Sequence, residues 1–279
     1  MTATGFTEAG PCPAADLRER RHVPGAALRG CIARMREDPA AEFRTETAAT
    51  ALGSSPFAFI RAFKAVTGLS PQRFHAAVRI EHAKRLLVET ERSVTDVSLD
   101  VGYSSLGTFV RTFTALVGVS PRQLRRLARG DRAAIDELGA LGAVTPGTGT
   151  MLHAELELPL PRGALVAAGL FPQGLPAGLP FDGCFVDSAS PRFSLAWPVS
   201  RRRASLLVAA VGSFDLGDAW AGRMNGIQVC GVALLPTMRG TGRLCLRLRP
   251  LMETDPPLLT PVPLLMQLQS VRSASAPGR

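Results

Sequence analysis

The chain has 279 residues, a length that favours two domains, and its formal net charge of +9 favours an anionic partner. Its five cysteines are scattered and form no C-x-x-C pair, which argues against a zinc site and a disulfide framework. No stretch reaches the roughly 18 apolar residues of a membrane span, so we expect a cytoplasmic protein without membrane, metal or cofactor.

The chain opens with residues 1–27, which lack an apolar core long enough for a signal peptide and are expected to be a mobile lead-in. Helices are predicted over residues 28–36 and 45–52. Asp38 and Pro39 close the first, and Gly53 ends the second. Thr45 is a candidate N-cap of the second helix.

One sequence unit then occurs twice, as SSPFAFIRAFKAVTGLSP at 54–71 and SSLGTFVRTFTALVGVSP at 104–121, with a constant offset of 50 residues. In each copy a serine can cap a helix, and two phenylalanines at i and i+4 form a stripe that we expect to be buried. A glycine-ended apolar segment precedes each copy, so the sequence predicts two helix-turn-helix units. Matching positions include Ser55 and Ser105, Phe59 and Phe109, Arg61 and Arg111, Phe63 and Phe113, and Gly68 and Gly118.

A predicted helix over residues 71–89 joins the two units, and its apolar positions follow a period of 3.6 residues. At about 1.5 Å per residue this helix is roughly 28 Å long. Ser93 and Asp96 form a capping-box-like start for the next helix, and Ser120 with Pro121 starts the last helix of the repeat region.

The order of these motifs resembles the AraC-type DNA-binding domain of bacterial transcription regulators. The resemblance covers residues 28–129. It is carried by G-x-S-x-x-x-F-x-R-x-F-K at 53–64, R-I-x-x-A-x-x-L-L at 79–87, G-Y-x-S-x-x-x-F-x-R-x-F at 102–113, and a G-x-S-P at the end of each repeat. It implies a seven-helix, double helix-turn-helix module whose two recognition helices enter successive major grooves of double-stranded DNA. The length of the joining helix suits this role, because successive grooves on one face lie about 34 Å apart.

The resemblance places the DNA-binding residues on the outer sides of the repeated helices and on the last helix. Arg61 and Arg111 stand where the family presents arginine to DNA; guanine binding, a phosphate contact and an intradomain ion pair are the open interpretations. Phe57 and Ile60 either contact thymine methyl groups or fill space beneath neighbouring helices. The candidate set is Ser55, Phe57, Ala58, Ile60, Arg61 and Lys64 in the first unit, Ser105, Leu106, Gly107, Thr108, Arg111 and Thr114 in the second, and Arg122 and Arg125 in the last helix.

The second unit departs from the family pattern. Leu106 and Gly107 lack hydrogen-bonding side chains, and Thr114 replaces an expected basic residue. We therefore expect this unit to read DNA shape and phosphates more than bases. The arginines of the last helix either lie along phosphates or only solvate the outer face; they are Arg122, Arg125, Arg126 and Arg129.

Basic charge is concentrated on the repeat region. Residues 28–129 hold 16 Lys or Arg against 9 Asp or Glu, whereas residues 1–27 are neutral. Thirty of the 32 basic residues are arginine, which suits bidentate contacts with guanine and phosphate or reflects a GC-rich coding sequence.

The remaining chain has a different character. Residues 130–150 are predicted to be a short helix over 131–138, stopped by Gly139, and a linker. Residues 151–265 contain short apolar runs separated by Gly and Pro, which indicate an antiparallel β-sandwich that resembles a transthyretin-like or carboxypeptidase-regulatory-like domain. The predicted strands cover 152–158, 165–171, 181–186, 193–197, 205–211, 228–234 and 243–248, and residues 266–279 are an expected tail.

These observations predict an α + β two-domain protein, with an all-α double helix-turn-helix domain followed by the sandwich. Its expected function is transcription regulation, with activation and an RNA polymerase contact implied by the resemblance. Two alternatives stay open: a sensor whose sandwich binds a small-molecule effector, and an interaction protein whose sandwich dimerises or docks a partner. No catalytic constellation is present, so no enzyme is expected, and the four histidines are interpreted as surface residues.

Overall fold

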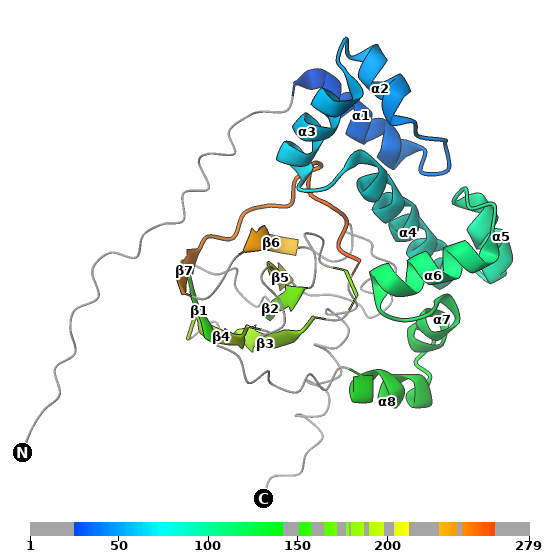
Figure 1. The fold of residues 1–279 in the computed structure, drawn as a ribbon. Coiled ribbons are helices and arrows are strands. Elements are labelled where there is room, and N and C mark those ends of the chain that lie inside the picture. The colour runs from blue at the N-terminus through cyan, green and yellow to red at the C-terminus, as the bar shows by residue number, and fades with distance from the viewer. Residues whose placement is uncertain are drawn as a thin grey trace, which may run out of the picture.

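The computed structural model describes residues 25–141, 151–157, 165–171, 177–178, 180–186, 190–197, 204–211, 229–238 and 242–259. A helical part comes first, and two β-sheets lie beside it (Figure 1). The expected tail and most of the expected lead-in and linker lie outside the described residues. The helices are α1 (Ala26–Glu37), α2 (Thr45–Ala51), α3 (Pro56–Thr67), α4 (Pro71–Glu89), α5 (Val94–Asp100), α6 (Leu106–Val117), α7 (Pro121–Ala128) and α8 (Arg132–Leu141).

The two copies of the repeat form helices α3 and α6 with matching ends. Ser55 and Ser105 are the N-caps, and each side-chain oxygen accepts a hydrogen bond from the amide of the residue three positions on, at 3.3 and 3.4 Å. Gly68 and Gly118 end the two helices at φ +77° and +92°, a left-handed conformation that favours glycine. Local sequence chemistry therefore sets both boundaries in the same way.

Three other helix boundaries test finer predictions. Ser93 caps α5 as predicted, since its side chain accepts a hydrogen bond from the Asp96 amide at 3.0 Å. The expected Thr45 cap was wrong, because Arg44 occupies the N-cap without a side-chain bond and Thr45 is buried. Gly139 does not stop α8, which continues to Leu141; glycine inside a helix costs about 1 kcal/mol relative to alanine but does not forbid it.

One hydrophobic cluster runs through the helical part. Phe59 and Phe63 of α3 and Phe109 and Phe113 of α6 are all buried in it, as the i, i+4 spacing predicts. The cluster also takes in Phe74 of α4 and residues of α1, α5 and α7. Because α3 and α6 bury equivalent faces, the equivalent opposite faces of the two helices point outward.

The strands form two sheets. Their order is β4-β1-β7 in a three-stranded sheet and β3-β2-β5-β6 in a four-stranded sheet. All pairs are antiparallel except β1 with β7, which is parallel, so the expectation of a purely antiparallel arrangement was wrong for this pair. The strands are β1 (Met151–Leu156), β2 (Leu165–Phe171), β3 (Asp182–Val186), β4 (Arg192–Ala196), β5 (Ala204–Val211), β6 (Val229–Met238) and β7 (Arg243–Leu246).

The two sheets share a second hydrophobic cluster. Leu195 and Leu246 enter it from the three-stranded sheet, and Leu170 and Leu206 enter it from the four-stranded sheet. The alternating burial along β1 and β4 matches the period-two pattern of the sequence. The resemblance to a transthyretin-like sandwich stays a prediction. No helix in the described ranges is long and apolar enough to cross a membrane.

Candidate nucleic-acid interface

Helix α3 presents a mixed polar and apolar outer face. Since Phe59 and Phe63 point into the core, the other sides carry Phe57, Arg61 and Lys64, which are all exposed. Phe57 is 76% exposed, which is unusual for a side chain of this size. It therefore does not fill space beneath a neighbouring helix. Ala58 and Ile60 lie at the edge of this face and are half-buried, and the capping residue Ser55 is exposed.

Helix α6 presents the corresponding outer face of the second unit. The candidate residues on it are exposed, including Leu106, and offer few hydrogen-bonding groups at the helix start. Arg111 is the one basic residue of α6, and it stands at the position equivalent to Arg61. The exposed candidate residues of this unit are Ser105, Leu106, Gly107, Thr108, Arg111 and Thr114.

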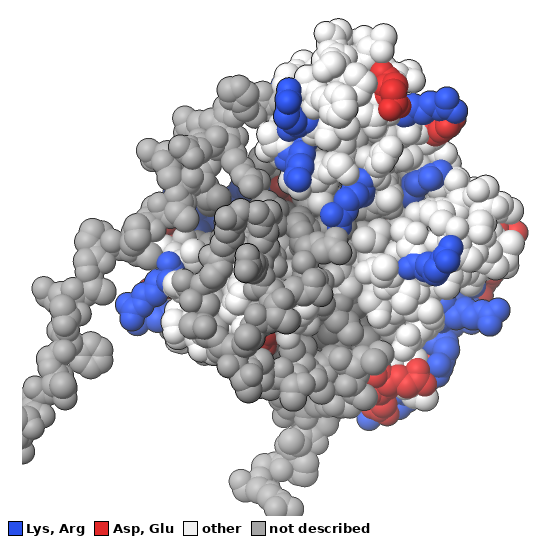
Figure 2. Space-filling model, in the orientation of Figure 1, with Lys and Arg blue, Asp and Glu red and all other residues white. Residues whose placement is uncertain are grey.

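Four of the candidate cations are unpaired. Within the described residues, the side chains of Arg61, Lys64, Arg111 and Arg122 form no hydrogen bond or ion pair. Figure 2 shows basic side chains following one another down the visible side of the helical part, from the region of α3 to the region of α7. Exposed guanidinium and ammonium groups without partners are available to an anion such as a phosphate.

The other arginines of α7 have partners within the chain. Arg125 is half-buried and donates to the main-chain oxygens of Leu87 at 3.1 Å and Arg92 at 2.5 Å, so it satisfies carbonyl groups at and after the end of α4. Arg126 pairs with Asp131 at 2.6 Å, and Arg129 pairs with Glu91. The arginines of this helix were interpreted either as phosphate contacts or as solvated surface residues. Phosphate contact fits Arg122 best, while Arg125 stabilises the end of α4.

Two buried polar residues of α4 were not recognised from the sequence. His75 is buried against the Phe43 ring, with centroids 5.7 Å apart, so its interpretation as a surface histidine was wrong. Burial, and then the nearby Arg79 cation, lower the pKa of His75. Lys84 is also buried. The sequence did indicate this, because Lys84 lies at helical spacing from the buried residues Ile80 and Leu87, on the same face of α4.

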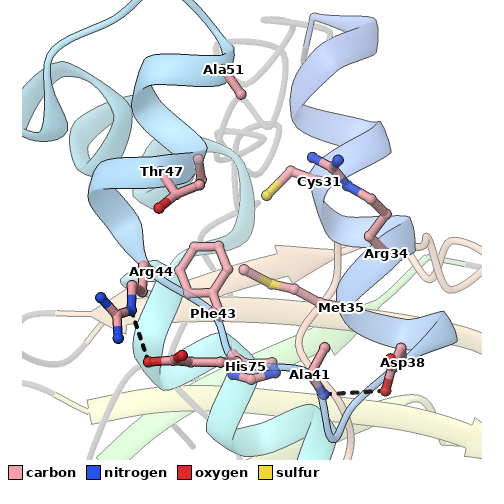
Figure 3. A pocket seen from close by; sticks show the side chains of 12 residues that line it. Cys31, Arg34, Met35, Asp38, Ala41, Phe43, Arg44, Thr47, Ala51 and His75 are labelled. Carbon is pink, nitrogen blue, oxygen red and sulfur yellow. Dashed lines mark hydrogen bonds and ion pairs between the residues drawn. The ribbon is translucent and has the colours of Figure 1, made fainter.

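A hollow of about 310 Å³ lies apart from these outer faces, between α1 and α2 (Figure 3). Cys31 and Met35 point into it from α1, Thr47 comes from α2, and the Phe43 ring lies between the two helices. Its volume is at the small end of the range of ligand pockets, about 300–1,000 Å³. None of the candidate DNA-binding residues lines it. Across the described ranges, no group of three His, Cys, Asp or Glu side chains could hold a metal ion.

Comparison with protein families places the same region in a known class. Residues 48–127, which extend from α2 into α7, match the family described as a helix-turn-helix domain. The fold and the exposed recognition faces thus define a double helix-turn-helix domain. This domain is of the AraC type.

Individual relatives are similar over part of the chain. An uncharacterized HTH-type transcriptional regulator, YobQ of Bacillus subtilis, is 45% identical over 47 residues, which are 17% of this chain and 20% of that protein. The chain therefore spans about a fifth of the length of this curated relative. The DNA-binding domain of the transcriptional factor AdpA, solved with a target DNA, is 29% identical and covers 38% of this chain and 96% of its own, with a TM-score of 0.36. A probable AraC family transcriptional regulator from Rhodopseudomonas palustris is 29% identical, covering 37% and 96%, with a TM-score of 0.34.

Proposed function

We propose that this protein is a sequence-specific DNA-binding transcription regulator whose α3 and α6 read two adjacent major grooves. The observation that carries the proposal is the pair Arg61 and Arg111. They occupy equivalent positions in the two repeats, both are exposed, and neither has a partner within the described chain. A guanidinium group can donate two hydrogen bonds to O6 and N7 of guanine, the commonest specific contact in the major groove.

The surrounding side chains are suited to the other contacts with DNA. Lys64 and Arg122 are unpaired cations suited to phosphate contacts, which fix register without reading sequence. The exposed Phe57 ring is suited to a thymine methyl group. In the second unit Leu106 and Gly107 offer no side-chain hydrogen bonds, so Arg111 is the base reader and DNA shape supplies the rest.

Activation of transcription is the finer part of the proposal. It rests on the AraC-type domain, since the family resemblance implies promoter binding and a contact with RNA polymerase. Transcription in vitro from a bound promoter, with and without the protein, tests this part. A decrease in transcript would identify a repressor instead, and DNA binding would be unaffected by that result.

Selection on random duplexes tests DNA recognition itself. Full-length protein is incubated with a random duplex library, and bound DNA is separated on a gel and sequenced over several rounds. We expect a bipartite site whose half-sites are centred about 10 bp apart, because two recognition helices on one face must be one turn of DNA apart. Enrichment of a single short site, or no enrichment, would contradict reading by both helices.

A small-molecule effector is the second candidate function, and the hollow between α1 and α2 is the observation that favours it. A thermal-shift screen of the full chain against small metabolites tests it, with Ala51→Phe as a variant that fills the hollow from α2. Hits that stabilise both proteins equally would place the effector elsewhere, for example in the β part, where the sequence alone suggested it. The role of the β part in dimerisation or partner docking likewise stays a prediction.

A further inference from the structure

Residues 249–259, which we call the strap, follow β7 and run up to the helices (Figure 1). Their shape is held by a bidentate ion pair, in which both Arg249 terminal nitrogens lie 2.7 Å from the two carboxylate oxygens of Asp255. The Met252 amide donates to the same carboxylate at 2.8 Å. Asp255 is buried and Arg249 is partly exposed, and the two-point geometry of their ion pair fixes the shape of the loop.

The strap is bonded to two helices through its main chain. Arg36 of α1 donates to the carbonyl oxygens of Glu253 at 3.1 Å and Asp255 at 2.7 Å. Lys84 of α4 lies 3.4 Å from the carbonyl oxygens of both Leu258 and Leu259. A buried ammonium group is costly unless it has acceptors, and the strap supplies them together with the nearby Glu81. The joint is therefore built into the helical part and is not a chance surface contact.

The strap makes apolar contacts with both the helices and the four-stranded sheet. Leu259 is fully buried and belongs to the hydrophobic cluster of the helical part. Its neighbour Leu258, with Leu251, packs against Phe171 of β2 and Leu207 of β5. The strap thus lies between the helices and the four-stranded sheet, and joins the two.

A second contact reaches the other helix-turn-helix unit. The Gly178 amide, just before β3, donates to the carbonyl oxygen of Leu116 at 2.7 Å, and Ala177 packs against the helical cluster. Leu116 is in the last turn of α6. Gly178 has φ +69°, and a Cβ there would lie 3.3 Å from the Ala115 carbonyl oxygen, so the approach is close. The β part consequently touches both α1 with α4 and the end of the second recognition helix.

We propose that the strap and residues 177–178 form a brace that fixes α3 and α6 relative to each other and so sets the half-site spacing that the protein accepts. The inference rests on the proposed DNA binding. Without the brace, α4 and the packing of α7 against it hold the two units together. With the brace, the β part spans both units, and a change in their separation would break contacts at one end or the other.

The experiment uses the full chain and two strap variants. Leu259→Ala removes the apolar anchor. Arg36→Met removes the bonds to Glu253 and Asp255, and with them the 3.5 Å ion pair with Glu81 of α4, but keeps an aliphatic chain against Phe74, over which Arg36 lies. Leu248→Ala is the matched control, since Leu248 packs against the cluster shared by the sheets. Affinities are measured for the selected site, for sites with the half-site spacing changed by one to three base pairs, and for one half-site alone.

We expect wild type and the control to prefer the selected spacing by about tenfold, which corresponds to about 1.4 kcal/mol, and both strap variants to lose most of this preference. Affinity for one half-site should change by less than about twofold, because the α3 face is untouched. Unchanged spacing preference in both variants would overturn the brace.

A second readout does not need DNA. Spin labels on non-natural ketone residues at the exposed positions Ala62 in α3 and Thr114 in α6 report the distance between the two helices. We expect one narrow distribution in wild type and a broad one in the strap variants. Equal widths would overturn the brace even if DNA binding stands. If wild type binds no duplex, the proposed function fails, and the label distances still decide whether the β part braces the helices.

Discussion

Arg79 in the middle of α4 donates from Nη2 to the carbonyl oxygen of Gly102, at 2.5 Å, in the turn of the second helix-turn-helix unit. The same guanidinium group donates from Nε to the carbonyl oxygen of Pro39, at 3.2 Å, in the loop before the first unit. Its carbon lies 5.1 Å from the centre of the Tyr103 ring. One side chain of the joining helix therefore ties together loops from both units.

The turn glycines of the two units should respond differently to alanine. Gly53 and Gly102 both have positive φ, +62° and +80°, so each substitution has a backbone cost of about 1–2 kcal/mol. A Cβ at Gly53 would meet nothing within 4 Å, whereas one at Gly102 would lie 2.0 Å from Nη2 of Arg79 and 2.7 Å from the Ala40 carbonyl oxygen. We expect Gly53→Ala to lower the free energy of unfolding by about 1 kcal/mol and Gly102→Ala by about 3 kcal/mol or more.

Urea unfolding followed by circular dichroism measures both variants under the same conditions. Arg85→Ala is the control on α4, because Arg85 is exposed and, within the described residues, its side chain hydrogen-bonds only to His82. It should change stability by less than about 0.5 kcal/mol. Equal losses in the two glycine variants would show that Arg79 moves aside at little cost, and that the tie is weak.

The parts of the fold that local chemistry sets could be predicted from the sequence. The cap of α3 at Ser55, its end at Gly68 and the buried Phe59 and Phe63 depend on residues close together in the chain. The parallel pairing of β1 with β7 joins strands far apart in sequence and leaves no local pattern. For the candidate site, the outward direction of Arg61 follows from helical periodicity.

Which arginines are free could not be predicted in the same way. The partners of Arg125 are carbonyl groups, and carbonyl groups carry no sequence signature. The acceptors of Lys84 lie 174 and 175 residues away, in a segment whose composition gives no sign of the contact. Long-range contacts to the main chain are thus the part of the structure that residue types alone do not encode.

Alanine in place of Arg61 or Arg111 should weaken specific DNA binding. Each change is expected to cost about 1–3 kcal/mol on the selected site and to relax the preference at one base-pair position. Arg126→Ala is the comparison, because this guanidinium already pairs with Asp131 and Glu137. Competition binding with every single-base variant of the site measures the effect. A uniform loss across all sequences would assign Arg61 and Arg111 to phosphates.

Alanine substitutions at Phe57 and Phe59 should affect different properties, DNA affinity for Phe57 and folding stability for Phe59. Phe57 is 76% exposed, so Phe57→Ala should change the free energy of unfolding by less than about 0.5 kcal/mol while lowering affinity at sites with a contacted thymine. Phe59 is buried, so Phe59→Ala should cost about 3–5 kcal/mol of stability. Replacing individual thymines with uracil, which lacks the methyl group, locates the contact. Equal affinity of wild type and Phe57→Ala for thymine and uracil duplexes would remove Phe57 from base reading.

The strap joint should make stability depend on pH through Lys84. Burial lowers the pKa of Lys84 from 10.5 to about 8, against the opposing effect of the Glu81 carboxylate. Between these values the unfolded chain binds the proton that the folded chain has released, so the contribution of Lys84 to stability rises with pH through this window and is constant below it.

At about 1.4 kcal/mol for each pKa unit, the free energy of unfolding of wild type relative to Lys84→Met should rise by about 2–3 kcal/mol from pH 8 to pH 10.5. Subtracting the variant removes the titration of cysteines and tyrosine, which both proteins share. Lys64→Met is the matched control, since Lys64 is exposed and its side chain forms no hydrogen bond or ion pair within the described residues. Urea unfolding at half-unit pH steps measures these differences. A flat difference for Lys84→Met would mean that folding does not lower the pKa of Lys84, either because the ammonium group reaches water or because its acceptors offset the effect of burial.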